Sequence, residues 1–439
     1  MRDIALTVVI LGLLPFVLRR PHWGVLLWAC IGIASPHRLT FGFANDLPWA
    51  AIAGATTLIA ILLCREPKRL PLAAPVVALL LFLGWTTVTS MFSVFPGDAW
   101  DAWQDLLKTQ LFVLVTLLMM QTRERIKALV WVIALALGFY GVKGGLYTLA
   151  QGGGGMVVGP QNSYIEGNTE IALALTMTIP LMYWLKRNTE GRWIRRALVA
   201  GMLLTTIAIL GSYSRGGLVA IAAMTAFFWL QSRTKIGVTV FLVLLVPALL
   251  AIMPGGWFDR MRTIQTYNKD ESARGRIAAW NFAKDLAADR PMVGGGFRVF
   301  QPEAYFRWAK QRPTEMFDAH SIWFEVLGNH GYFGLGLFVL MWGLCWRTAI
   351  RIRRLTEGHT ELWWAADLAR LTLVSLIGYW VGGSFLGLAY WDFPYVLMAL
   401  LVLTLTVVSK QVAATSTGGA APAVGVPIAA LRSRPQGQS

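Results

Sequence analysis

Apolar stretches separated by short polar joints recur along almost the whole chain, and this pattern constrains the fold more than any other feature. A transmembrane helix needs about 20 mainly apolar residues. Stretches that approach this length lie near residues 4–18, 23–35, 49–63, 72–92, 109–120, 128–150, 170–185, 197–213, 216–230, 236–253, 322–346, 371–388 and 395–409. The chain is 56% hydrophobic and only 14% charged, which is typical of a polytopic membrane protein. We therefore predict an all-α membrane protein with about 12 transmembrane helices. The first two stretches are short and flank Arg19 and Arg20, so they form either two full spans or one broken, re-entrant pair.

The positive charge of the chain is concentrated in alternate joints. The formal net charge is +16, with 39 Lys and Arg, which in a soluble protein would suggest a nucleic-acid partner. Here the cations lie in loops between apolar stretches, as the positive-inside rule predicts for cytoplasmic loops. The basic joints read LRRPHW, CREPKRLP, QTRERIK, LKRNTEGRWIRR, QSRTK and RTAIRIRRLTEGH. We assign these joints to the cytoplasm and expect no nucleic-acid partner.

The joints between them carry few cations, and we assign them to the opposite, periplasmic face. They read SPHRLTFGFANDLPW, SVFPGDAWDAWQDLLK, QGGGGMVVGPQNSYIEGN, GSYSRGG and AYWDFP. The one long polar segment, residues 254–321, falls on the same side and holds eleven Lys or Arg. The predicted domains are a transmembrane bundle over 1–253, a periplasmic catalytic loop over 254–321, C-terminal transmembrane helices over 322–409 and a disordered cytoplasmic tail over 410–439.

The long polar segment is expected to fold into a compact cap over a cavity, because a structureless loop of this length would be unusual. Ser272 can cap a helix that ends at Arg290-Pro291. Ile277, Trp280, Phe282 and Leu286 would form its apolar face. A second helix is expected over 302–310.

Arg215 is the first candidate for a functional residue. One helix over 197–230 would be about 50 Å long, against a hydrocarbon core of about 30 Å, so the chain must break, and GSYSRGG is the place. This leaves Arg215 at or just below the outer surface. An arginine within the membrane costs about 2.5–3.5 kcal/mol, so we expect an anionic partner or a water-filled cavity there. The alternative is a cation that snorkels from a helix end.

His320 and three further arginines are the other candidates. His320 precedes the apolar run IWFEVLG, where protein can shield it, and a neutral imidazole can accept a proton from a sugar hydroxyl. A capping or core histidine is the alternative. Arg274 and Arg276 open the expected helix, whose positive end favours phosphate, and the arginine fork binds phosphate oxygens in pairs. Arg298 follows three glycines that would let the backbone approach a ligand closely.

Metal and cofactor chemistry are not expected. Asp98, Asp101 and Asp105 share one helical face and resemble a metal cluster, but a solvated face of an interfacial helix explains them. The three cysteines, Cys30, Cys64 and Cys345, have no paired spacing and are interpreted as packing residues.

Four short motifs together resemble the O-antigen ligase and polymerase superfamily of the WaaL/Wzy type. They are SRGG at 214–217, R-x-x-x-W from Arg276 to Trp280, P-x-x-G-G-G-F at 291–297 and H-S-x-W-x-E-x-x-G-x-x-G from His320 to Gly331. The similarity spans roughly residues 170–346. The run SPHRLTFGFANDLPWA also resembles an exosortase-associated O-glycosylation ligase branch.

The resemblance implies a twelve-span inner-membrane glycosyltransferase of the GT-C type that acts at the periplasmic face without a metal. It would move an assembled glycan from undecaprenyl pyrophosphate to lipid A-core, with inversion. His320 matches the family histidine that activates the acceptor hydroxyl, and Arg215 and Arg276 match arginines that would hold the pyrophosphate. Arg298 and Arg274 are secondary candidates for the same pocket. The usual histidine-serine-histidine-asparagine form is reduced here to AHSIW, which leaves the acceptor open.

Other functions stay open at this point. A polymerase that joins repeat units, or a ligase whose acceptor is a protein side chain, would use the same residues. A transporter of lipid-linked sugar would instead place its charges near the middle of the membrane and open to both sides. A structural scaffold for another enzyme would not depend on His320.

Overall fold

The computed structural model describes residues 1–232, 234–262, 271–310 and 316–418, and in these residues it contains helices but no β-strand. The N-terminal half consists of α1 (Arg2–Arg19), α2 (Pro21–Ala34), the 3₁₀ turn η1 (Pro36–Leu39), α3 (Trp49–Leu63), α4 (Ala74–Met91), α5 (Pro96–Met119), α6 (Arg123–Ala150) and α7 (Asn168–Arg187). The C-terminal half consists of α8 (Arg192–Gly211), α9 (Arg215–Gln231), α10 (Lys235–Leu250), α11 (Gly255–Arg262), α12 (Glu271–Asp289), α13 (Pro302–Trp308), α14 (Ile322–Leu355), the 3₁₀ turn η3 (Thr360–Leu362), α15 (Trp363–Gly383) and α16 (Asp392–Gly418).

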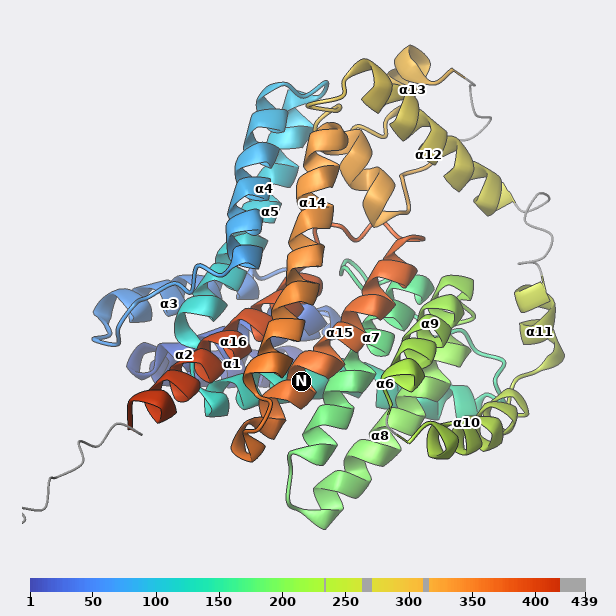
Figure 1. The fold of residues 1–439 in the computed structure, drawn as a ribbon. Coiled ribbons are helices and arrows are strands. Elements are labelled where there is room, and N and C mark those ends of the chain that lie inside the picture. Colours follow the sequence, from blue (N-terminus) through green and yellow to red (C-terminus); the bar gives the residue numbers. More distant parts are fainter. Residues whose placement is uncertain (233, 263–270, 311–315, 419–439) are drawn as a thin grey trace, which may run out of the picture.

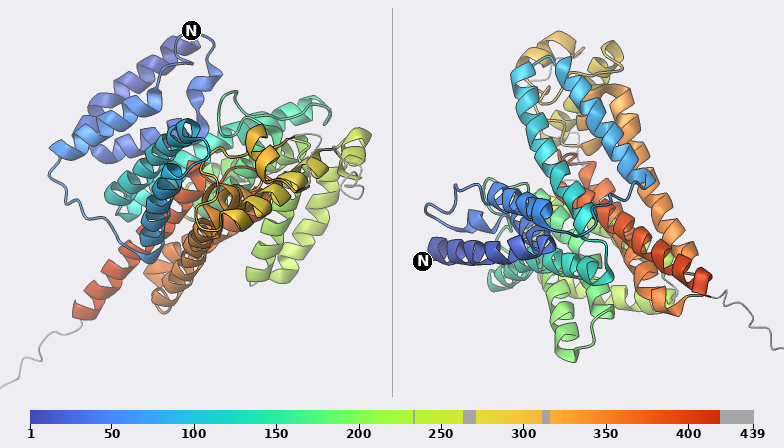
Figure 2. Two further views of the ribbon diagram at one scale, coloured as in Figure 1. Left: turned by 90° about the horizontal axis from the view of Figure 1, so that it is seen from above. Right: turned by 90° about the vertical axis from the view of Figure 1, so that its left-hand side faces the viewer.

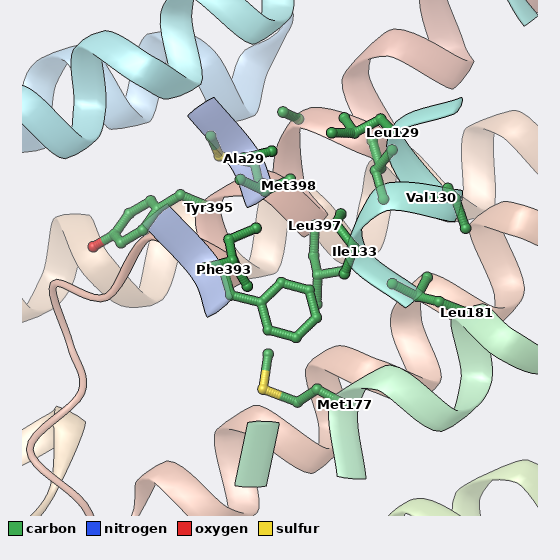
Figure 3. Packing of buried hydrophobic residues seen from close by; sticks show 14 of the residues in the cluster. Ala29, Leu129, Val130, Ile133, Met177, Leu181, Phe393, Tyr395, Leu397 and Met398 are labelled. Carbon is green, nitrogen blue, oxygen red and sulfur yellow. The ribbon is translucent and has the colours of Figure 1, made fainter. Parts of the chain in front are cut away.

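The arrangement has two parts, which the right-hand view of Figure 2 separates clearly. Helices α4, α5 and the longer part of α14 stand together and project from the rest, with α12 and α13 at the projecting end (Figure 1). Among the remaining helices, α16 contacts α15, α6 and α2. Phe393, Leu397 and Met398 of α16 lie among buried side chains of α2, α6 and α7 (Figure 3). A single continuous apolar core therefore holds the N-terminal and C-terminal helices together.

Among the residues that the structure describes, five helices are long and apolar enough to cross a membrane, or six if α10 and α11, which meet at an angle of 111°, count as one span. The five are α4, α6, α8, α14 and α16. Helices α2, α3 and α9 are apolar but shorter. The all-helical, polytopic character predicted from the sequence is confirmed, whereas the number of twelve crossings stays a prediction.

The basic joints that we assign to the cytoplasm meet one another in space. Arg125 in QTRERIK donates two hydrogen bonds of 2.8 Å to the carboxylate of Glu66 in CREPKRLP. Lys127 donates to the carbonyl oxygen of Asn188 at 2.8 Å, and Arg187 forms an ion pair with Asp367 at 2.6 Å. Joints that are far apart in the sequence thus gather at one region.

The joints assigned to the opposite face also meet one another. The backbone N–H of Val94 donates to the carbonyl of Gly295 at 2.8 Å, and Gln301 donates to Asp98 at 2.7 Å, so the second of these joints contacts the long polar segment. At the other end of the chain, the N–H of Gly42 donates to Asp3 at 2.9 Å, so α1 begins beside the first of these joints. Helices α1 and α2 are therefore two separate helices. The assignment of the two sets of joints to opposite sides of the membrane stays a prediction.

Helix α14 reverses direction near its start. Gly331 has φ 68° and ψ −173°, which ends a first helix at about residue 330. The rings of Trp323 and Phe338 are only 5.8 Å apart, although a straight helix would separate those positions by about 22 Å. Residues 322–330 thus form a short helix that runs antiparallel to 332–355 (Figure 1). The predicted single span over 322–346 is therefore wrong, and the crossing helix begins after Gly331.

Glycine backbone contacts make this reversal possible. Gly295 and Gly296 donate N–H bonds of 2.8 Å to the carbonyls of Gly328 and Asn329, and Tyr332 donates to Pro291 at 2.8 Å. A Cβ at Gly294 would lie 2.6 Å from the carbonyl oxygen of Gly328. The three glycines therefore approach the backbone of α14, where the sequence predicted an approach to a ligand.

The break between α8 and α9, the end of α12 before Pro291 and the start of α13 at Pro302 all agree with the prediction. The side chain of Ser272, the expected cap, lies outside the described residues. Phe282 and Leu286 are buried as expected, but Ile277 is 41% exposed, so it does not belong to the packed face. Helix α16 continues to Gly418, so residues 410–418 are helical where the sequence predicted the beginning of a disordered tail.

Candidate active site

Helix α12 positions the segment that carries His320. The indole N–H of Trp280 donates a 2.8 Å hydrogen bond to the carbonyl oxygen of Ala319, and its ring stacks on Phe324 at 5.0 Å. One turn earlier, Gly275 lies flat against the ring of Phe317, where a Cβ would collide with the ring. Because residues four apart share one helix face, the R-x-x-x-W spacing directs Arg276 toward the segment that Trp280 holds.

His320 adopts an uncommon backbone conformation at this point. Its φ of 39° lies in the left-handed region, which histidine adopts more readily than most residues. Residues held in such conformations often lie at functional sites, because the surrounding structure must offset the strain. Here two contacts offset the backbone strain at His320. The Trp280 hydrogen bond holds Ala319 before it, and α14 begins directly after it. The half-buried imidazole follows Ala319, which is fully buried.

The environment of His320 favours a neutral imidazole. Its pKa is lowered from 6.5, first by burial and then by the guanidinium of Arg276. The carboxylates of Asp318 and Glu170 act in the opposite direction. A cation and two carboxylates therefore surround one histidine, and at neutral pH this histidine can accept a proton. Of these charged residues, Arg276 was predicted from the sequence and Glu170 was not.

Arg215 lies at the start of α9, beside the first turn of α7. The hydroxyl oxygen of Ser214 caps α9 by accepting the N–H of Gly217 at 2.9 Å. A Cβ at Gly216 would lie 3.1 Å from the Cγ2 of Thr169, and Asn168 donates to the carbonyl of Ser212 at 2.9 Å. The glycines of SRGG thus allow the two helix starts to pack closely. Glu170 belongs to the same turn of α7. This turn therefore packs against the start of α9 and also carries a carboxylate that raises the pKa of His320.

Arg274 and Arg298 are placed differently from Arg276. Two residues correspond to about 200° of helix rotation, so Arg274 lies on the opposite face of α12, and it is exposed. Arg298 is 53% exposed and its guanidinium is 4.0 Å from Asp105 of α5. We expected Arg274 and Arg298 to share one pocket with Arg215 and Arg276. In the described part of the chain, no contact supports this expectation.

Ser321 is a further polar residue of the site. It is 1% exposed, and its hydroxyl has no hydrogen-bond partner among the described residues. A buried hydroxyl without a partner is costly, and this one stands directly beside His320. The serine of the H-S-x-W motif is the sequence signal that could have identified it.

Two family models match the chain. Residues 1–190 match a family of unknown function, DUF5935, and residues 200–339 match the family described as O-antigen ligase. The segment over residues 200–339 is therefore similar to the O-antigen ligase family. The matched segment includes Arg215, Arg276 and His320, whereas Glu170 belongs to the DUF5935 part. No curated protein matches the chain. The finer resemblance to the exosortase-associated branch stays a prediction.

The similarity to the O-antigen ligase family supports a membrane glycosyltransferase-type enzyme that handles lipid-linked glycans. Among the described residues, no group of three or more His, Cys, Asp or Glu could hold a metal ion. Asp98 and Asp105 bond instead with Gln301, Lys108 and Arg298.

Trp280→Phe should test whether the indole hydrogen bond positions His320. Phenylalanine keeps most of the stacking on Phe324 but cannot donate to Ala319, so kcat should fall by about 3- to 10-fold, the equivalent of one net hydrogen bond, with little change in donor affinity. Trp308→Phe is the matched control, because Trp308 of α13 donates its indole N–H to Asp289 of α12 and the variant removes that hydrogen bond. Equal kcat values for the two variants would show that the Trp280 bond has no positioning role.

Proposed function

We propose that the chain transfers an assembled glycan from undecaprenyl pyrophosphate to lipid A-core at the periplasmic face of the bacterial inner membrane. The observation that carries the proposal is the adjacency of His320 and Arg276 within the segment that matches the O-antigen ligase family. Glycosyl transfer from a pyrophosphate without a metal requires a neutral base to accept the proton of the acceptor hydroxyl. It also requires a fixed cation to stabilise the charge of the leaving pyrophosphate.

In the proposed reaction, His320 accepts the proton of an acceptor hydroxyl while that oxygen attacks the anomeric carbon of the donor glycan. The bond between the anomeric carbon and the pyrophosphate oxygen breaks, and undecaprenyl pyrophosphate leaves. Arg276 and Arg215 would stabilise the negative charge that develops on the leaving group, because guanidinium binds phosphate oxygens bidentately. Glu170 favours the imidazolium that forms on His320.

The proposed topology places residues 254–321 on the periplasmic side. The segregation of basic and non-basic joints supports it, as do the shared contacts of the non-basic joints with the long polar segment. The short helix over 322–330 would then enter the outer leaflet region and return, which is tolerated where protein surrounds it.

The dependence of kcat/KM on pH should show an acidic limb below pH 6.5. The active form of His320 is neutral, and its pKa is lowered by burial and by Arg276. Activity should therefore persist as the pH falls to 6.5 and disappear only as it passes through the lowered pKa. The same limb should be absent from the residual activity of His320→Asn. A limb above pH 6.5 that persists in this variant would assign the titration to another group.

Transfer should survive complete chelation. Arginines can neutralise the pyrophosphate charge without Mg²⁺, so activity in excess EDTA should stay within about twofold of the untreated rate, which is a change of under 0.5 kcal/mol in barrier height. Complete loss that Mg²⁺ or Mn²⁺ restores would instead require a metal site and would reopen the role of Asp98 and Asp101.

Reconstitution with defined acceptors tests the proposed function. Purified protein in lipid would receive a lipid-linked glycan together with lipid A-core, a growing glycan or an acceptor protein, each in a separate reaction. Lipid A-core should gain the mass of the glycan. Mass gain only on the growing glycan or only on the protein would replace the ligase assignment with a polymerase or a protein glycosylation enzyme.

A further inference from the structure

A cavity lies among the helices that the DUF5935 part contributes and the start of α16. It has a volume of about 490 Å³, and its lining includes Trp28, His37, Lys108, Tyr164 and Asp392. These residues come from α2, η1, α5, the 150–167 connection and α16. Four of them belong to, or directly adjoin, the joints that the sequence places on the periplasmic face. The cavity is therefore built where non-basic joints converge.

Two polar side chains of the lining have atoms without hydrogen-bond partners. Asp392 is 8% exposed, and its Oδ1 has no partner among the described residues; the same holds for Nδ1 of His37. Gly32 of α2 makes room for the Asp392 carboxylate, since a Cβ there would lie 2.9 Å from Oδ2. A buried carboxylate oxygen left unpaired costs free energy, so these atoms point to a ligand that donates hydrogen bonds to Asp392.

The charges around the cavity restrict the chemistry of that ligand. The cations are already engaged within the protein: Lys108 bonds to Asp105 at 3.0 Å, and Arg38 bonds to Asn45 at 2.9 Å. A phosphate would face the Asp392 carboxylate, whereas an ammonium group would face Lys108 and Arg38. A neutral molecule rich in hydroxyl groups avoids both conflicts, because each hydroxyl both donates and accepts.

The apolar part of the lining fits the same class of molecule. Trp28 and Phe112 contact each other with ring centroids 5.2 Å apart, and both line the cavity with Tyr164. Aromatic rings beside a few convergent polar groups are typical of small-molecule sites, and they can pack against the C–H face of a sugar ring. Asn162 and Ser163 add amide and hydroxyl groups to the same wall.

Two short chain segments link residues near the cavity to residues near His320. Tyr164 lies within electrostatic range of the carboxylates of Asp392, Asp105 and Glu325. Glu325 follows His320 by five residues. Tyr164 also precedes Glu170, the carboxylate that acts on His320, by only six residues. The Cα atoms of Tyr164 and Glu170 therefore lie at most about 22 Å apart. A glycan of a few sugar units could occupy both places.

We propose that this cavity binds a sugar ring of one of the two glycan substrates at a distance from the reacting bond. The assignment of the sugar to a transfer substrate rests on the proposed function, whereas the binding itself does not. Asp392 accepts hydroxyl hydrogen bonds, and Trp28 with Tyr164 packs against the ring. The cavity thus selects the glycan, while His320 and the arginines act on the bond that changes.

Calorimetric titration of the full chain in nanodiscs tests the binding directly. The probes are two lipid-free, pyrophosphate-free oligosaccharides: the core oligosaccharide, and one repeat unit of the O-antigen glycan. At least one should bind saturably, and Asp392→Asn should weaken it by about tenfold or more, as expected for a hydrogen bond to a charged group. Gly32→Ala should act in the same direction, because it displaces the carboxylate. Asp259→Asn, at a 75% exposed aspartate, is the control.

Each outcome has a defined meaning. Weaker binding in Asp392→Asn with unchanged thermal stability supports the site, and transfer kinetics then identify the source, since KM rises for the acceptor or for the donor. Failure of both probes to bind, or equal affinity in wild type and both cavity variants, overturns it. If the wild-type chain transfers no glycan but binds a probe through Asp392, the proposed function fails while the sugar site stands.

Discussion

Replacement of His320 by alanine is expected to lower the rate of glycan transfer by about 10²- to 10⁴-fold, the range of a positioned general base. The imidazole is held by the Trp280–Ala319 bond and kept neutral by burial and Arg276. Without it no group accepts the proton of the acceptor hydroxyl. Binding of undecaprenyl pyrophosphate should change little, because the arginines remain.

The design must separate lost chemistry from backbone strain, since His320 has a φ of 39°. Asparagine tolerates this conformation better than alanine, so His320→Asn should fold at least as well and be equally inactive. His359→Ala, at a partly exposed histidine near η3, is the matched control. Turnover and donor affinity should both be measured on purified protein in lipid. Near-normal turnover in His320→Asn would remove His320 from the chemistry, whereas loss of donor binding in both variants would move it into the donor site.

Arg276→Lys and Arg215→Lys are each expected to reduce kcat/KM by about 10-fold or more. Lysine keeps the charge but loses the planar fork that holds two phosphate oxygens at once, and a charge-assisted bond contributes about 1.5–3 kcal/mol. Arg274→Lys is the control for α12, because Arg274 is exposed on the opposite face. Arg192→Lys, at the exposed start of α8, is the control at the other end of the helix pair.

The comparison of Arg276→Lys with Arg274→Lys, both on α12, shows most clearly whether one face of this helix binds the pyrophosphate. A loss in Arg276→Lys that exceeds the loss in Arg274→Lys at equal membrane abundance would assign the pyrophosphate contact to the face that carries Trp280. Equal rates for the two variants would mean that the cap binds anions by its overall charge, and the site around His320 would then lack a specific donor contact. Equal rates for Arg215→Lys and Arg192→Lys would likewise remove Arg215 from the site.

Local signals in the sequence predicted the helix boundaries that surround the site. The bilayer width required a break before Arg215, and Pro291 and Pro302 mark the end of α12 and the start of α13. The reversal at Gly331 was not predictable in this way, because residues 322–346 read as one apolar run. Its cause is tertiary: the backbone of 291–296 bonds to carbonyls of residues 328 and 329.

In the structure, the guanidinium of Arg276 lowers the pKa of His320, but the roles of the two residues stay predictions. The sequence identified both residues as candidates. It did not identify Glu170, because one carboxylate in the first turn of a helix is also an ordinary end-of-helix residue. Nor could it predict the cavity around Asp392, whose walls come from six separate segments. Arg298 was grouped with the pyrophosphate site through its glycines, but those glycines serve the α14 reversal.

The configuration of the newly formed glycosidic bond tests the central claim most directly, namely that His320 directs an acceptor hydroxyl onto the anomeric carbon in a single displacement. The product of wild-type protein, lipid-linked glycan and lipid A-core would be analysed by NMR at the anomeric position. Direct attack predicts inversion relative to the undecaprenyl pyrophosphate linkage. Retention of configuration would require a covalent glycosyl-enzyme intermediate and would contradict the proposed role of His320, as would a product that forms equally well with His320→Asn.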